Sequence, residues 1–178
     1  MKFEKYIEES KKLKGTMVGF GIESSKLKEI YDYIESWLIK YNISYVKQKN
    51  PHFSIAMIPG TYDKDEIVRE MNLISKGQIF KPKDITILKG KKTKKDFISI
   101  EYKPGKEFIN NFNKISDKFE VVKFGAVRPH ISLFMIDQDS KINDFYVDMI
   151  HGMPKLPRVK PSKIELWNQK NEREYIKK

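Results

Sequence analysis

Two apolar stretches of the chain share the same pattern, and each begins with a proline. Residues 51–58 read Pro-His-Phe-Ser-Ile-Ala-Met-Ile, and residues 129–136 read Pro-His-Ile-Ser-Leu-Phe-Met-Ile. Their length, their β-branched content and the turn residues around them predict a strand in each case. The two octets agree at five of eight positions, whereas unrelated octets share about one or fewer. We interpret them as a duplicated supersecondary unit.

The remaining hydrophobic pattern predicts a mixed order of helices and strands. Helices are predicted over residues 3–13, about 24–41, 63–75, 105–118 and 141–150. Strands are predicted over residues 15–22, 44–47, 52–58, 84–89, 97–102 and 130–136, and in a closing hairpin of 162–168 and 172–177. Three glycines in the first strand indicate that something approaches its backbone closely. Because hairpins join several strands, we expect an α+β fold with antiparallel sheets, formed by a single domain over residues 1–178.

Each octet places a histidine and a serine on one face of its strand. Alternate residues of a strand point to the same side, so His52 shares a face with Ser54, and His130 with Ser132. The same alternation predicts that the opposite, apolar faces carry Phe53, Ile55, Met57, Ile131, Leu133 and Met135. If a pseudo-twofold axis relates the two units, their polar faces meet across a groove.

Two imidazoles and two hydroxyls around one groove suit the cleavage of a phosphodiester. A neutral histidine accepts a proton from the attacking oxygen, and a protonated one donates to the leaving oxygen; each transfer typically contributes about 10²–10⁴-fold. Serine hydroxyls donate hydrogen bonds to the non-bridging oxygens, where charge builds in the transition state. We therefore predict four catalytic residues: His52, Ser54, His130 and Ser132. The third histidine, His151, has no counterpart in the repeat and is predicted to be a loop residue.

Composition restricts the class of protein further. The chain has 178 residues, no cysteine and a formal net charge of +11. The absence of cysteine excludes disulfides, thiolate metal sites and a cysteine nucleophile. No Asp, Glu and His stand together at ligand spacing, so we expect neither a metal nor another cofactor. The positive charge favours nucleotides or nucleic acids as partners, and is equally typical of a lysine-rich chain.

No apolar run is long enough to span a membrane, and the N-terminal residues lack the apolar stretch of a secretory signal. We therefore expect a cytoplasmic protein without a membrane partner, and infer no obligate protein partner. The lysine-rich turn of Lys91, Lys92, Lys94 and Lys95 is predicted to be a solvated turn.

The duplicated motif resembles that of the 2H phosphoesterase superfamily, which is named for two H-x-[S/T] motifs. The resemblance is carried by His52-Phe53-Ser54 and His130-Ile131-Ser132, whose histidines are 78 positions apart in the sequence. It implies a bilobal fold in which two antiparallel sheets face a central cleft with helices on the outside. It also implies metal-free cleavage of phosphodiesters, often with attack by a neighbouring ribose 2′-oxygen.

Within the superfamily, the chain looks most similar to phage proteins that destroy the cyclic oligonucleotide signals of bacterial CBASS immunity. That resemblance implies cleavage of 3′–5′ bonds by 2′-hydroxyl attack, in the host cytoplasm if the protein is viral. It also implies that Phe20, Glu165 and Trp167 hold bases, since an aromatic ring stacks on a base and a carboxylate accepts from an exocyclic amine. Arg128, directly before the second motif, is a candidate phosphate contact.

Two alternatives stay open. In the first, a 2H enzyme with the same chemistry acts on short RNA at its ends, on 2′,5′-oligoadenylate or on 2′,3′-cyclic phosphates. In the second, the protein is a non-catalytic nucleotide- or RNA-binding module that keeps the groove. In either enzyme, the symmetry of the motifs leaves open which histidine is the base and which is the acid.

Overall fold

The computed structural model of the protein describes residues 15–59, 62–90, 94–121, 128–139, 141–167 and 173–176. Its strands are β1 (Gly15–Gly21), β2 (Tyr45–Lys47), β3 (His52–Pro59), β4 (Lys81–Lys89), β5 (Lys95–Lys103), β6 (His130–Asp137), β7 (Lys163–Trp167) and β8 (Arg173–Ile176). Its helices are the 3₁₀-helix η1 (Ser24–Leu27), α2 (Lys28–Lys40), α3 (Lys64–Ser75), α4 (Lys106–Lys118) and α5 (Ile142–His151). The predicted α+β class is confirmed. The helix predicted over residues 3–13, and Lys91 and Lys92 of the predicted turn, lie outside the described residues.

The eight strands of the described chain form one antiparallel sheet, in the order β4-β5-β6-β3-β1-β7-β8, with β2 paired to β6. The two motif strands β3 and β6 are neighbours at the centre, and they are partners at a single position, Phe53 with Ile131. The two antiparallel sheets that the resemblance implied are therefore joined into one sheet at this contact. One edge of β6 pairs with β3 near its start and with β2 near its end. This shared edge joins the two halves of the sheet, one formed by β4, β5, β6 and β2 and the other by β3, β1, β7 and β8.

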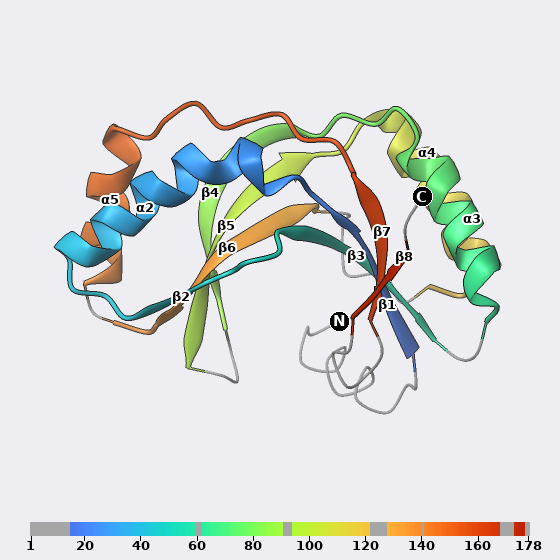
Figure 1. The fold of residues 1–178 in the computed structure, drawn as a ribbon, viewed down its shortest axis with the longest axis horizontal. Helices are drawn as coiled ribbons and strands as arrows, with labels where there is room; N and C mark the ends of the chain where they lie inside the picture. The colour runs from blue at the N-terminus through green and yellow to red at the C-terminus, as the bar shows by residue number, and fades with distance from the viewer. Residues whose placement is uncertain are drawn as a thin grey trace.

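The four α-helices lie on one side of the sheet in two pairs, α2 with α5 and α3 with α4 (Figure 1). The helix α2 follows β1 but lies over the half that contains β6, whereas α4 follows β5 and lies over the half that contains β1. Each helix buries an apolar stripe with three- and four-residue spacing; in α4 it is Phe108, Phe112 and Ile115. Because α2 and α4 each cover the half of the sheet opposite to the strand that they follow, the two halves share one continuous core.

The chain consists of two repeat units with the same order of elements, β1-α2-β3-α3-β4 and β5-α4-β6-α5-β7. The strand β2 is an addition to the first unit. The last strand of each unit joins the other half, since β4 pairs with β5 and β7 with β1. The registers also match: Gly21–His52 corresponds to Glu101–His130, and Gly19–Ser54 corresponds to Ser99–Ser132. The duplicated unit inferred from the octets is confirmed.

A β-bulge follows the serine of each motif. The partners of adjacent β1 residues pass directly from Ser54 to Ala56, so Ile55 is the extra residue of β3. Leu133 is the extra residue of β6 at the equivalent position. A bulge exchanges the faces on which the following residues lie, relative to simple alternation.

The bulges correct one prediction about the apolar faces. Alternation placed Met57 and Met135 in the core, but neither belongs to the main cluster of buried apolar residues in the described chain. The residues that take their place in this cluster are Ala56, Ile58, Phe134 and Ile136. The shared methionine of the two octets therefore lies on the same face as the histidines, beyond the bulge.

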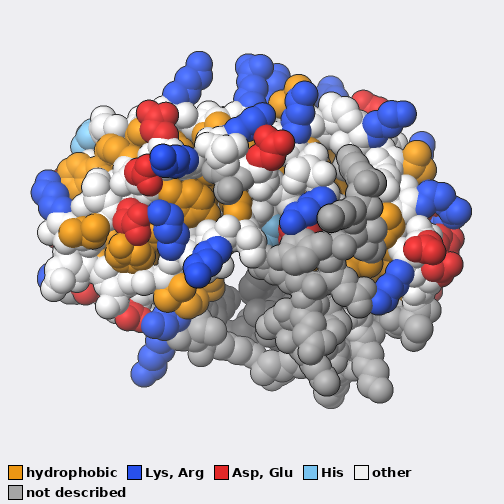
Figure 2. All heavy atoms as spheres, in the orientation of Figure 1, with side chains coloured by type: hydrophobic (Ala, Val, Ile, Leu, Met, Phe, Trp, Pro, Cys, Tyr) orange, Lys and Arg blue, Asp and Glu red, His pale blue; other side chains and the backbone are white. Residues whose placement is uncertain are grey.

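Lysine and arginine side chains are spread over the visible face of the molecule in Figure 2. On this face, the net charge of +11 is not gathered into a single patch. Within the described residues, the helices are all too short or too polar to cross a membrane.

Candidate active site

The fold brings the two predicted motifs together at the junction of β3 and β6. The paired residues Phe53 and Ile131 point into the core and have no exposed surface. Their neighbours in each strand point to the other face, away from the helices, and are partly exposed: His52, Ser54, His130 and Ser132. Because the strands run antiparallel, each serine lies on the side of the junction occupied by the histidine of the other motif.

Both imidazoles are held in the same way. Nδ1 of His52 lies 3.0 Å from the carbonyl oxygen of Asn50, and Nδ1 of His130 lies 3.2 Å from that of Arg128. A carbonyl only accepts hydrogen bonds, so this contact assigns the proton to Nδ1 and leaves Nε2 as the ring nitrogen that can accept a proton. The proline before each histidine has a fixed φ, which limits where this carbonyl points. The shared Pro-His pair of the octets thus has a role in the site.

The indole of Trp167 packs against the imidazole of His52, with ring centroids 4.8 Å apart and an interplanar angle of 52°. Trp167 is on β7, so its ring crosses β1 to reach β3. Gly19 makes this possible, because a Cβ there would lie 2.5 Å from the indole and 2.2 Å from the carbonyl oxygen of Phe53. The close approach predicted from the glycines of the first strand is confirmed, and Trp167 is brought to the site.

Glu165 lies beside the same glycine-rich strand and is almost completely buried, with 1% of its surface exposed. A Cβ at Gly21 would lie 2.7 Å from its Oε1, and Nζ of Lys163 is 3.5 Å from that oxygen. Its second oxygen, Oε2, has no hydrogen-bond partner among the described residues. A buried acceptor without a partner costs about 1–3 kcal/mol, and more when charged. Glu165 therefore holds an acceptor that the described fold does not use.

The structure corrects the prediction for Phe20. Its side chain has no exposed surface and packs edge-to-face on Phe108 of α4, with ring centroids 6.4 Å apart. Strand alternation points it toward the helices, opposite to Gly19 and Gly21. The prediction that Phe20 stacks on a base is wrong because its ring is part of the core.

Arg128 is exposed, and its backbone carbonyl holds the His130 ring. The phosphate contact predicted for its side chain stays a prediction. His151 is exposed at the last position of α5 rather than in a loop. Among the described residues, no three His, Cys, Asp or Glu side chains are grouped so that they could hold a metal ion.

Sequence reasoning missed Ser99. This buried serine on β5 lies beside the second motif, with its Oγ 3.2 Å from Oγ of Ser132. The equivalent position in the first half is Gly19. The serine of the second motif therefore has a fixed hydroxyl partner, and the corresponding space in the first half is taken by the indole of Trp167. Only alignment of the two strands that precede the motifs would have revealed this position.

Comparison with known proteins identifies the fold. No protein-family model and no curated protein match the chain. The solved structure of Usb1 from Kluyveromyces marxianus aligns with a TM-score of 0.54 and 11% identity, over 92% of this chain and 97% of that chain. The structure of the same yeast protein with uridine monophosphate aligns with a TM-score of 0.51 and 10% identity, over 90% and 96%. At this level of identity the similarity shows that the chain shares the overall fold of these Usb1 structures.

Proposed function

We propose that this protein is a phosphodiesterase that acts on RNA ends by general acid–base catalysis with His52 and His130. The proposal is carried by the matched pair of imidazoles, which occupy equivalent register positions and are held by the same Nδ1 contact. The Usb1 structure with uridine monophosphate supports a ribonucleotide substrate. This comparison, rather than the imidazole pair, favours the short-RNA alternative over the cyclic oligonucleotide.

The reaction needs one proton to be removed and one to be supplied. One imidazole accepts the proton of the ribose 2′-hydroxyl through Nε2, and the 2′-oxygen attacks the adjacent phosphorus. The bond from phosphorus to the 5′-oxygen of the last nucleotide breaks, and the other imidazole, protonated, donates to that oxygen. The shortened RNA ends in a 2′,3′-cyclic phosphate, and the released nucleoside carries a 5′-hydroxyl.

The hydroxyls and the carboxylate have separate parts in this scheme. Ser54 and Ser132 donate to the non-bridging oxygens as charge builds on them, and Ser99 keeps the Ser132 hydroxyl in place. Glu165 offers its buried Oε2 to a donor on the base, such as an exocyclic amine. Trp167 orients the imidazole of His52 by packing against it. The surroundings of the two motifs therefore differ: Trp167 packs beside the first, and Ser99 is hydrogen-bonded to the serine of the second.

The cyclic-oligonucleotide hypothesis depended on Phe20, Glu165 and Trp167. Phe20 is buried in the core and no longer supports this hypothesis. The comparisons do not support the anti-CBASS assignment. The catalytic steps are the same for either substrate, so a substrate panel decides between them. The phage origin stays a prediction.

The test is incubation of the purified protein with a short RNA, cyclic di- and trinucleotides and 2′,5′-oligoadenylate, followed by mass spectrometry of the product ends. We expect shortening of the RNA from one end and a terminal 2′,3′-cyclic phosphate, with no effect of EDTA. His52→Ala and His130→Ala should each lower kcat by at least about 10²-fold. His151→Ala, at the exposed end of α5, is the matched control.

A 2′-deoxy residue at the scissile linkage should block cleavage, because the attacking oxygen is absent. If both single histidine variants cut RNA like the wild type, the proposal is wrong. Cleavage of cyclic nucleotides but not of RNA would restore the first hypothesis.

A further inference from the structure

Two cations face each other where the loop after α5 meets the start of β4. Phe80 and Val159 form an isolated antiparallel bridge, with Phe80 N 2.9 Å from Val159 O and Val159 N 3.2 Å from Phe80 O. Both side chains are buried in the core. Lys81 follows Phe80 and Arg158 precedes Val159, so these two residues lie opposite each other on the face turned away from the core. Both are exposed.

The line of cations continues across the sheet toward the active site. In β4, Lys81 is the partner of Lys103 in β5, which is also exposed. The hydrogen bond from Tyr102 N to Pro129 O, 2.8 Å long, extends the pairing of β5 with β6 and brings Lys103 level with Arg128. We call these four residues the cationic row: Arg158, Lys81, Lys103 and Arg128. With neighbouring strands about 4.8 Å apart, the row spans about 14 Å and ends two residues before His130.

The charges of the cationic row are not balanced by the fold. None of its members has an ion pair within the described residues, whereas the nearby Lys83 is paired with Glu101 at 3.0 Å. Like charges directly opposite each other on adjacent strands are destabilising. The fold thus keeps a repulsive arrangement that an anion would relieve.

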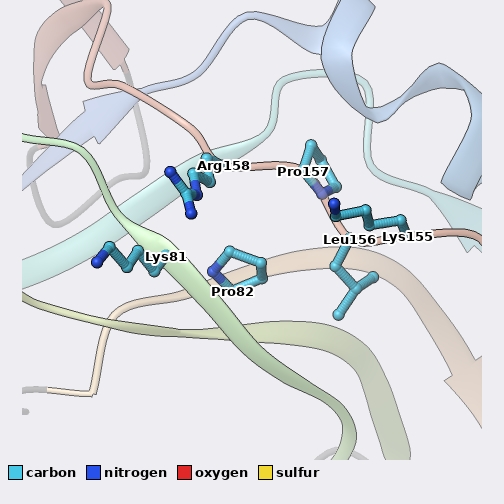
Figure 3. Close-up of a pocket in the computed structure, with 6 residues that line it drawn as sticks. All are labelled: Lys81, Pro82, Lys155, Leu156, Pro157 and Arg158. Atoms are coloured by element: carbon cyan, nitrogen blue, oxygen red, sulfur yellow. The ribbon is translucent and has the colours of Figure 1, made fainter.

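A hollow of about 490 Å³ lies at the far end of the row. It is lined by Lys81, Pro82, Lys155, Leu156, Pro157 and Arg158. Lys81 and Arg158 lie on one side of it, with the prolines and Leu156 alongside (Figure 3). Its lining combines cations with apolar surface and contains no acidic residue, which suits a nucleotide, whose phosphate is anionic and whose base is flat and weakly polar. The fixed φ of two prolines and the Phe80–Val159 bridge limit how far this lining moves.

We infer that the cationic row and the hollow form an extended binding site for single-stranded RNA, which holds the part of the strand that leads away from the scissile phosphate. The inference rests on the proposed function for its choice of RNA as the ligand. Its contacts are to backbone phosphates, so binding there is independent of sequence and sensitive to salt.

Binding is measured with protein that carries His52→Ala and His130→Ala, so that the RNA stays intact. Fluorescence anisotropy of a labelled single strand of about ten nucleotides gives the affinity and its dependence on salt. The row variant adds Lys81→Gln, Lys103→Gln and Arg158→Gln. Arg128 is left unchanged so that its backbone carbonyl, which contacts Nδ1 of His130, keeps its position. The control adds three exposed helical or turn substitutions with the same loss of charge: Lys26→Gln, Lys114→Gln and Lys141→Gln.

We expect the row variant to bind the single strand at least tenfold more weakly and the control less than twofold. Each phosphate contact to a single strand contributes about 0.7 to the slope of log K against log salt, so three lost contacts reduce the slope by about 2. The melting temperature of the row variant should stay the same or rise, because repulsive pairs are removed. A row variant that binds as tightly as the control overturns the inference.

Cleavage by protein with intact histidines separates this inference from the proposed function. If both hold, the ratio of kcat/KM for the long strand to kcat/KM for a dinucleotide falls in the row variant and not in the control. If the wild type cleaves no RNA and the row variant still loses binding, the proposed function is wrong and the binding site stands. If RNA is cleaved and the ratio is unchanged, the proposed function stands and the binding site is wrong.

Discussion

The indole of Trp167 lies against the imidazole of His52, with ring centroids 4.8 Å apart, although the two residues belong to strands that are separated by β1. The indole can cross β1 only because Gly19 has no side chain. The position of the first histidine thus depends on a glycine and a tryptophan from distant parts of the sequence. Among the described residues, no aromatic ring packs in this way against the second histidine, and the serine of its motif is hydrogen-bonded to Ser99 instead. The two repeat units have the same backbone arrangement and differ in the side chains that surround each motif.

Gly19→Ala tests the crossing of the indole. The added Cβ would lie 2.2 Å from the carbonyl oxygen of Phe53 and 2.5 Å from the indole, so Trp167 or the strand must move. We expect a loss of about 1–3 kcal/mol in the free energy of unfolding, measured with urea, and at least a tenfold loss of kcat/KM. The control is Gly105→Ala, where the nearest atom would be 3.6 Å from the Cβ. Equal behaviour of the two variants would contradict this account of Gly19.

Ser99→Ala tests whether Ser99 positions the hydroxyl of Ser132. Loss of this buried hydrogen bond should lower the free energy of unfolding by about 1 kcal/mol. Because the hydroxyl is proposed to act on developing charge, kcat should fall several-fold while KM changes little. Ser116→Ala is the control: the buried Oγ of Ser116 has no hydrogen-bond partner among the described residues, so removal of this hydroxyl should be neutral or stabilising. A change in stability with no change in kcat would show that Ser99 has only a structural role.

Glu165→Gln tests the carboxylate oxygen that has no partner. The substitution keeps the shape and removes a buried charge, and the lost ion pair with the partly exposed Lys163 contributes little. We expect the free energy of unfolding to rise by about 1 kcal/mol while KM for RNA increases. Glu29→Gln, on the exposed side of α2, should change neither quantity. Unchanged KM in Glu165→Gln would exclude a contact between Glu165 and the substrate.

Asp96→Asn tests a buried carboxylate that holds the ends of β4, β5 and β6 together. Burial alone would raise the pKa of Asp96, but hydrogen bonds from Lys89, Gln138 and the Gly90 amide outweigh it and hold the pKa below its usual value. A lowered pKa in the folded state gives stability that is present above about pH 4, the unfolded value, and is lost as the pH falls through the folded value.

Urea unfolding should therefore show that Asp96→Asn is less stable than the wild type by about 2 kcal/mol at pH 7, and that the two converge as the pH falls below about 4. Asp117→Asn, an exposed aspartate on α4, is the control and should show no such dependence. A difference in stability that is constant from pH 7 to pH 3 would show that the charge of Asp96 is not what stabilises this end of the sheet.

The sequence by itself determined most elements of the described residues and singled out the four motif residues. A strand exposes alternate residues on one face, so each His-x-Ser placed its two polar groups together without any knowledge of the fold. The repeated octet predicted a duplicated unit, and the glycines of β1 predicted a close approach, because these signals lie within a few neighbouring residues. Local backbone geometry is sufficient to interpret patterns of this kind.

Only the tertiary structure decided what surrounds the motifs. The bulges at Ile55 and Leu133 moved the methionines out of the core cluster, and the alternation of β1 placed Phe20 inside it. The contact of Trp167 with His52, the hydroxyl pair of Ser99 and Ser132, and the cationic row all join residues that are distant in sequence. These arrangements depend on strand order and register, which are set when the sheet assembles, so no local pattern in the chain records them.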